Sequence, residues 1–338
     1  MPDPLRRIGR RGFLAGAAAT GALSVKAVRA EALRPMTFVT PFGYLVAFAP
    51  DLVGKAGGYF EREGLDVTIA GGRGSAQSVQ QVLSGQALMS RTGGADIMKA
   101  IANEDAPVVV VATINQGSPF FVISKKTAPV RTPEDMQGKV IGVISKGGGS
   151  ENLLDAMLAE RGIDPATVKR EAVGDSPGAF GLIEAGRLNA FIGAIGTLIG
   201  LQGASAPIEY FSTDDYAPVP GQVYIAAREA VSRQPDMIVR YLRGVRAAVD
   251  AMLADEAMDK TLELLANFEI AALKDPAIAK ADLKANKALW LSAGRAALLR
   301  NVPERWQRGR DLLAKVGAVK PGPASDLYTN ALVDQALR

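Results

Sequence analysis

The chain has 338 residues, of which 48% are hydrophobic and 22% charged, with a formal net charge of +4. It contains no histidine and no cysteine, which excludes Ser-His-Asp and Cys-His nucleophile systems, ordinary zinc sites and disulfides. The sequence also has no Walker loop, paired-carboxylate signature or Ser-x-x-Lys motif. We therefore expect a binding protein rather than an enzyme, with no metal and no cofactor.

The first thirty residues have the layout of a twin-arginine export signal. Arg10-Arg11 precedes an apolar run at 13–25, and small residues follow near 28–30. The run is about 13 residues long, well short of the roughly 20 that span a bilayer. The sequence predicts a signal peptide at 1–30 and a periplasmic protein; the alternative is a cytoplasmic chain with a basic tail.

Removing this segment changes the charge balance. Of the 39 basic and 35 acidic residues, six and one lie in 1–30, which leaves 33 basic and 34 acidic. The basic pI therefore belongs largely to the predicted signal, and nucleic acid is not an expected partner. About 308 residues remain, more than one hydrophobic core usually organises, so two lobes are predicted.

Strand and helix patterns alternate through the first part of the mature chain. Strands are predicted at 36–40, 65–69, 87–90 and 107–114, with helices at 45–56, 76–83 and 95–102. Ser75 is a plausible N-cap for the second of these helices, and Gly85 ends it. The alternation is typical of an α/β lobe with a largely parallel sheet.

A second stretch repeats this plan. A helix start is predicted at Thr132-Pro133, strands at 139–144, 171–173 and 188–195, and helices at 151–161 and 178–184. Segments 82–87 and 183–190 are each the end of a helix, a glycine stop and an apolar strand. This similarity suggests two lobes of one architecture on either side of a cleft.

After a further strand at 221–228 the chain is predicted to be helical. Apolar stripes run through 237–253, 261–268, 285–299 and 325–337, and we expect these helices to close over the first lobe. Trp290 and Trp306 are interpreted as packing residues rather than ligand platforms.

Three segments carry a family resemblance. They are Tyr59-Phe60-Glu61-Arg62-Glu63-Gly64-Leu65-Asp66-Val67, Leu83-Ser84-Gly85-Gln86-Ala87, and the run 132–143, TPEDMQGKVIGV. In this order and spacing they resemble the solute-binding proteins of bacterial importers for nitrate, sulfonates and taurine. That group shares a domain with thiamine-pyrimidine synthases. The second segment departs from the family pattern, since Ala87 or Leu88 stands where an Asp is common.

The resemblance implies an α/β, two-lobed periplasmic-binding-protein fold (type II) with additional C-terminal helices. Residues 31–115 and 222–338 would form lobe 1 and residues 116–221 lobe 2, with a hinge at 115–121 and 218–222. The protein would be a monomer that delivers a small-molecule ligand to the permease of an ABC transporter in the inner membrane. The alternatives are a receptor for a membrane sensor, or an enzyme of the synthase type, whose histidine and cysteine-rich segment are missing here.

The carboxyl ends of the strands give the candidate ligand site, because open α/β lobes bind ligands where loops lead into helix starts. The residues expected there are Phe42, Gly43, Tyr44, Ser75, Thr92, Gly93, Gln116, Ser145, Gly148, Gly149, Ser150 and Thr197. Phe42 and Tyr44 would either stack on a planar ligand or pack the first lobe.

The turn Gly147–Gly149 points to the ligand class. Its backbone N–H groups and the helix that follows would bind a small organic anion of the sulfonate, nitrate or carboxylate type, with Arg73 or Lys146 as counter-charges. Alternatively, the glycines only allow the backbone to turn, and Arg73 and Lys146 are solvated surface side chains. Asp175 is the one acidic residue placed in these loops, so a cationic ligand is less favoured.

Overall fold

The computed structural model describes residues 32–338, and residues Leu33–Arg338 form one compact unit. The predicted signal peptide at 1–30 lies outside the described residues. Within the described part, every helix is too short or too polar to cross a membrane.

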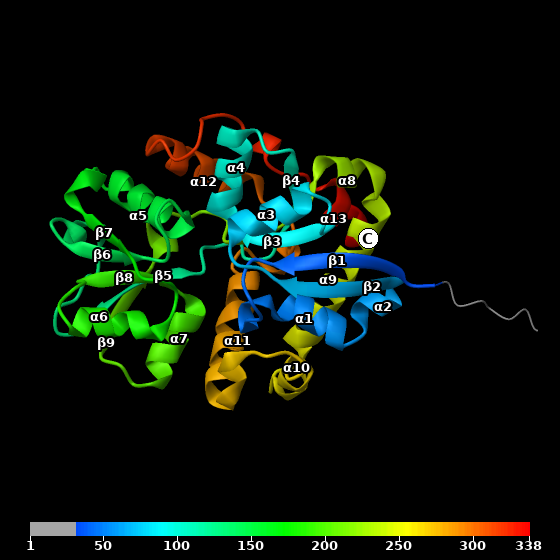
Figure 1. Ribbon diagram of the computed structural model, residues 1–338, viewed down its shortest axis with the longest axis horizontal. Helices are drawn as coiled ribbons and strands as arrows, with labels where there is room; N and C mark the ends of the chain where they lie inside the picture. Colours follow the sequence, from blue (N-terminus) through cyan, green and yellow to red (C-terminus); the bar gives the residue numbers. More distant parts are fainter. Residues whose placement is uncertain (1–31) are drawn as a thin grey trace, which may run out of the picture. The chain divides into compact units, whose positions relative to one another are not determined.

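Two five-stranded sheets organise this unit (Figure 1). The first sheet has the order β2-β1-β3-β10-β4, and all its strands run parallel to one another except β10. Its strands are β1 (Arg34–Thr40), β2 (Leu65–Gly71), β3 (Met89–Gly93), β4 (Val108–Thr113) and β10 (Gln222–Ala227).

The second sheet has the order β7-β6-β8-β5-β9, and here β5 is the antiparallel strand. Its strands are β5 (Phe120–Lys125), β6 (Val140–Val143), β7 (Lys169–Ala172), β8 (Ala190–Ala194) and β9 (Ile208–Ser212). The sequence analysis did not predict β5 or β9, and β5 begins inside the segment 115–121 that was expected to be a hinge.

Both sheets follow the same plan. In each, the fourth position is an antiparallel strand that the chain enters directly after crossing from the other sheet: β5 follows β4, and β10 follows β9. The segments 82–87 and 183–190 lead into β3 and β8, each of which occupies the third position in its sheet. The predicted common architecture is confirmed, and each sheet is largely parallel, as predicted, with one antiparallel strand.

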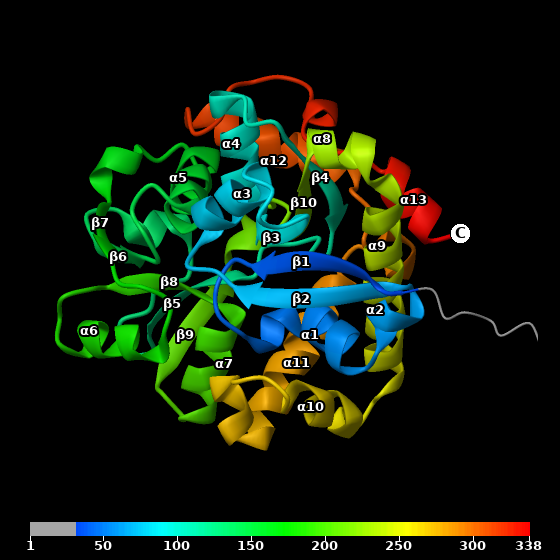
Figure 2. The same cartoon turned by 45° about the vertical axis from the view of Figure 1, so that its right-hand side comes forward.

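Helices cover both faces of the first sheet (Figure 2). One face packs against α1 (Ala49–Ala56), α2 (Tyr59–Arg62) and the C-terminal helix α9 (Pro235–Ala254). The other packs against α3 (Ser75–Leu83) and α4 (Gly94–Glu104). A left-handed Gly85 ends α3, as its sequence predicted.

The second sheet is covered by α5 (Gly149–Glu160), α6 (Phe180–Glu184) and α7 (Ile195–Gly203). The predicted helix start at Thr132 is present as a capping box, in which the Thr132 side chain and Asp135 satisfy each other's backbone N–H groups. It caps a single 3₁₀ turn, Pro133–Met136, rather than a full helix.

The C-terminal helices differ most from the sequence prediction. They are α8 (Arg228–Arg233), α9, α10 (Asp259–Leu265), α11 (Pro276–Trp290), α12 (Pro303–Lys315) and α13 (Ala331–Ala336). Asp275 caps α11 through hydrogen bonds from two backbone N–H groups, so this helix begins at Pro276 and not at 285. The highly charged α12 has too short an apolar stripe to be recognised.

Two of these helices reach beyond the first sheet. α11 packs against α7, and α12 packs against both α4 and α5. The expectation that the C-terminal helices close over the first lobe is therefore too narrow, since they also contact helices of the second sheet. Trp290 and Trp306 are both fully buried, which confirms their role in packing.

Candidate functional site

The carboxyl ends of the parallel strands in the two sheets lead into helix starts that meet one another. α4 contacts α5, and α7 contacts α11. We call this region the junction and define it by Asp96, Gly149, Gly196 and Asp282. It is where the strand-end rule places a ligand in an α/β fold.

The two crossing segments run side by side along the junction. The backbone N–H groups of Ile114 and Asn115 both donate to the carbonyl of Gln222, and Gly221 N–H donates to the Asn115 carbonyl at 2.9 Å. The N–H of Gly94, the first residue of α4, donates to Gly221 at 2.8 Å. The crossing is thus tied to the start of a helix that faces the second sheet.

The crossing segments approach too closely for a side chain. A Cβ built on Gly94 would lie 1.9 Å from the Pro220 carbonyl oxygen, and one built on Gly221 would lie 2.1 Å from that of Gly117. Both contacts are to backbone atoms, which cannot rotate away. These two glycines are required by the packing of the crossing.

Asp96, in the first turn of α4, stands at the centre of the junction. The Ser75 hydroxyl and the Gly149 backbone N–H stand beside its carboxylate as hydrogen-bond donors. Its Oδ1 lies 3.0 Å from the position that a Cβ on Gly149 would take. Burial raises the pKa of Asp96, while these two donors and the charge of Lys99 act against that rise.

A second carboxylate contact lies between α7 and α11. Asp175 Oδ1 accepts from the Ala194 N–H at 3.0 Å and from Thr197 Oγ1 at 2.7 Å. Asp282 of α11 is buried, and its Oδ2 lies 3.3 Å from the position of a Cβ on Gly196. Burial, together with the charge of Asp175, raises the pKa of Asp282 to about 6.

Several buried polar atoms near the ends of the first-sheet strands have no hydrogen-bond partner within the described residues. They are Thr92 Oγ1, Gln222 Oε1 and both amide atoms of Asn115. Thr92 and Asn115 are 0% and 1% exposed. Buried polar groups in folded proteins are nearly always paired, so these atoms are candidates for contact with a ligand.

The structure brings some of the predicted site residues together. Ser75, Gly93 and Gly149 all lie beside Asp96. A Cβ on Gly93 would be 2.9 Å from Asp96 Oδ2, and one on Gly149 would be 3.0 Å from Oδ1. Thr92 directly precedes Gly93 in β3. Thr197 belongs instead to the second contact, through Asp175.

Other predicted residues have structural partners in the first lobe. The Tyr44 hydroxyl donates to the Ile69 carbonyl at 2.9 Å, and its ring packs edge-on against Phe268 with centroids 5.3 Å apart. Phe42 is 44% exposed, and Gly43 lies beside Gly71. Ligand contact by these residues stays a prediction.

The side-chain amide of Gln116 is hydrogen-bonded to backbone carbonyl groups. Its Nε2 donates to the carbonyls of Thr113, Ala297 and Arg300, which ties the crossing to the C-terminal segment. This network satisfies the amide nitrogen of the side chain, so a ligand would compete with three carbonyls for it.

In the turn before α5, Ser150 Oγ accepts from the Ile144 N–H at 3.0 Å, whereas Ser145 is exposed beside Gly148. Arg73 and Lys146 are also exposed. The ligand contacts predicted for this turn stay predictions.

Sequence reasoning did not single out Asp96, Asn115 or Asp282. Asp96 could have been found, because it follows Thr92-Gly93-Gly94 in the first turn of a predicted helix. Asp282 could not, since only the tertiary packing of α11 against α7 brings it to the junction.

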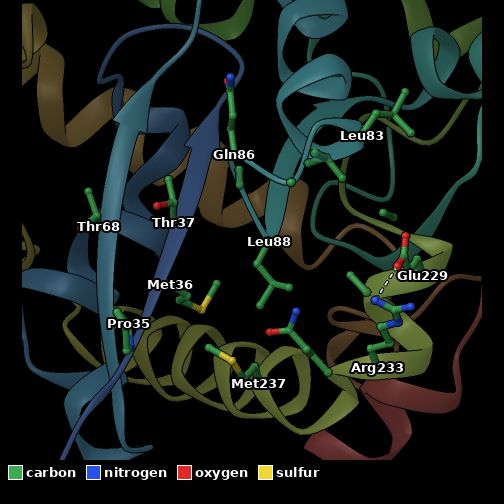
Figure 3. A pocket seen from close by; sticks show the side chains of 16 residues that line it. Pro35, Met36, Thr37, Thr68, Leu83, Gln86, Leu88, Glu229, Arg233 and Met237 are labelled. Carbon is green, nitrogen blue, oxygen red and sulfur yellow. Dashed lines mark ion pairs between the residues drawn. The ribbon is translucent and has the colours of Figure 1, made fainter.

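A surface pocket of about 470 Å³ lies elsewhere, near the amino ends of β1 and β3 (Figure 3). Met36, Leu88 and Met237 contribute to its lining, and the exposed pair Glu229–Arg233 stands at one side with 2.9 Å between charged atoms. It is far from the carboxyl ends of the parallel strands, so we do not assign the ligand to it.

Comparison with known proteins bears on the fold and the family. The NMT1/THI5 like family model matches residues 46–257. The chain belongs to the NMT1/THI5 like family. The resemblance found in the sequence is confirmed, and the two mixed five-stranded sheets are those of the periplasmic-binding-protein fold.

Relatives of this NMT1/THI5 like chain have different named ligands. The riboflavin-binding protein RibY of Chloroflexus aurantiacus is 22% identical over 310 residues, which are 89% of this chain and 86% of RibY. The periplasmic aliphatic sulphonate binding protein SsuA of Escherichia coli superposes with a TM-score of 0.68 at 17% identity, covering 89% of this chain and 99% of SsuA. An enzyme also shares the fold: the desulfurization enzyme DSZB matches with a TM-score of 0.58 at 12% identity, over 90% and 99% of the two chains.

Proposed function

We propose that this protein is the solute-binding component of an ABC importer. The observation that carries the proposal is the junction itself. Helix starts from the first sheet lie there against the first turn of α5, and the ends of the first-sheet strands carry unpartnered buried polar atoms beside two antiparallel crossing segments. Family membership and the names of the relatives RibY and SsuA support the same function.

An enzymatic role finds less support in the residues. The chain has no histidine and no cysteine, so the junction offers carboxylates, hydroxyls and amides but no common nucleophile–base pair. These groups suit recognition by hydrogen bonding. The ligand would be a small polar solute, bound and released unchanged.

The location and partner follow from this function. The twin-arginine pattern at Arg10-Arg11 supports export to the periplasm, and the permease of the importer in the inner membrane would be the partner. Changing both arginines to lysine should keep the chain in the cytoplasm, which cell fractionation would reveal. Periplasmic accumulation of that variant would contradict the twin-arginine route.

A thermal-shift screen of residues 31–338 tests the binding function. Methanesulfonate, nitrate, benzoate, uracil and riboflavin are suitable probes. A ligand at about 100 times its dissociation constant adds about 2.7 kcal/mol of stability. Gly149→Val should abolish the shift, because the new side chain would begin 3.0 Å from Asp96 Oδ1.

The matched control is Gly181→Val in α6, where a Cβ would meet nothing within 4 Å. This variant should keep the full shift. The proposal fails if Gly149→Val binds like the native chain, or if mass spectrometry shows that the recovered ligand has been chemically altered.

A further inference from the structure

Three helices of the junction begin around one carboxylate. Ser75, Gly94 and Gly149 are the first residues of α3, α4 and α5, and the Asp96 carboxylate lies beside Ser75 and Gly149. Helix starts carry unpaired N–H groups and a partial positive charge, so together they form a position that favours an anion.

We propose that Asp96 is a specificity-determining residue that fills this anion position with the protein's own carboxylate. The ligand then presents an uncharged or cationic hydrogen-bond donor to the junction, and sulfonate, nitrate and carboxylate groups are excluded from it. This inference rests on the proposed function as a solute-binding protein.

The charges around Asp96 support exclusion of a second anion. The cation that acts on Asp96 is Lys99 of α4, whose Nζ lies 3.5 Å from the Gly147 carbonyl oxygen. Glu151, in the first turn of α5, adds a negative charge and accepts from the Gly147 N–H. The Arg170 guanidinium pairs with this charge, since its Nε lies 3.5 Å from Glu151 Oε1. The Asp96 carboxylate is therefore the negative group that an anionic ligand at the helix starts would meet directly, and like charges repel strongly in a buried site.

An independent observation indicates that a ligand group binds beside Asp96. Thr92 is 0% exposed, and its Oγ1 has no partner within the described residues. It lies directly opposite Val223 in the ladder, and Val223 belongs to the same buried apolar cluster as Ile97 of α4. Directly paired strand residues share a face, so Thr92 points to the side that α3 and α4 cover, where Asp96 lies.

The chemistry of these groups defines the ligand class. Asp96 accepts hydrogen bonds only, the Thr92 hydroxyl donates and accepts, and the Asn115 amide offers one unpartnered donor and one unpartnered acceptor. A solute with amide, ureido or amine N–H groups complements this set. A fully ionised oxyanion, which only accepts, does not.

Methanesulfonate is the probe that tests Asp96 directly, by isothermal titration calorimetry on residues 31–338 at low salt. Asp96→Asn keeps the shape of the side chain and removes its charge. We expect methanesulfonate to bind this variant at least tenfold more tightly than the native chain, and the gain to shrink as sodium chloride is added. Asp96→Ser provides a second, smaller replacement should the first fail to fold.

The control is Glu104→Gln, at the exposed end of the same helix. It makes the same change in net charge and should leave methanesulfonate binding unchanged. Tight binding by the native chain would overturn the inference but leave the solute-binding function intact. Failure of both Asp96 variants to gain affinity would also overturn it, because the helix starts would then not form an anion position.

Discussion

Asp51 and Arg91 form a fully buried ion pair in the first lobe, with 3.2 Å between Asp51 Oδ2 and Arg91 Nη1. The hydroxyls of Tyr224 and Tyr241 donate to Asp51 Oδ1 at 3.0 and 2.7 Å. Burial raises the pKa of Asp51, and the charge of Arg91 and the two hydroxyls oppose that rise. Four residues from α1, β3, β10 and α9 are thus bonded to one another. We therefore assign this network a role in the stability of the fold rather than in ligand binding.

Arg91→Met should destabilise the protein severely, because it leaves the Asp51 carboxylate buried without a counter-charge. We expect the free energy of unfolding at pH 7 to fall by about 3–5 kcal/mol, measured by urea denaturation. Arg233→Met breaks an exposed pair with Glu229 and should cost less than about 1 kcal/mol. Equal losses in the two variants would contradict this account of the buried network.

At the scale of elements, the crossing segments determine how the two sheets are connected. The strand after each crossing enters the other sheet antiparallel to its neighbours, and the crossings are hydrogen-bonded to each other between Asn115 and Gly221–Gln222. A ligand-dependent movement of one sheet relative to the other would bend the chain at these hydrogen-bonded crossings and shift the contacts of α11 and α12 with the second sheet.

Gly221→Ala should disturb this crossing. The new methyl group would lie 2.1 Å from the Gly117 carbonyl oxygen, so the backbone has to shift, at a cost of about 1–3 kcal/mol in unfolding free energy. Gly43→Ala, where a Cβ meets nothing within 4 Å, is the matched control and should be nearly neutral. Chemical denaturation of both variants measures the difference, and a neutral Gly221→Ala would show that the crossing is loosely packed.

At the scale of the whole described unit, α11 joins the two sheets and carries a buried carboxylate to their junction. Asp282 has a pKa of about 6, above its ordinary value of 3.8, so the folded state binds its proton more tightly than the unfolded state does. Stability from this group is therefore fully present below about pH 4 and is lost as the pH rises through 6. Ionised Asp282 facing Asp175 weakens the contact between α11 and α7.

Asp282→Asn should remove this penalty. Near pH 8 we expect the variant to exceed the native chain in unfolding free energy by up to about 3 kcal/mol, and near pH 4 the two should be alike. Melting temperatures measured from pH 4 to 8 give the comparison. Asp105→Asn, an exposed residue whose left-handed backbone Asn also adopts, should show no such pH-dependent gain. A pH-independent difference for Asp282→Asn would contradict the assignment.

The sequence by itself determined the features that neighbouring residues encode. Runs of five to eight residues rich in apolar side chains predicted β1, β2 and β4, the glycine stop at Gly85 predicted the end of α3, and three ordered segments identified the family. Caps, periodicity and glycine conformations are local properties, so they can be recognised without knowing the rest of the chain.

Only the tertiary structure decided which groups meet. The antiparallel strands β5 and β10, the contact of Asp96 with Gly149, and the approach of α11 to α7 all join residues far apart in the sequence. The sequence predicted an anion-binding turn before α5, and tertiary packing places a carboxylate of the chain itself against that turn. Such encounters depend on how the chain crosses between its two sheets, a long-range arrangement that no local pattern encodes.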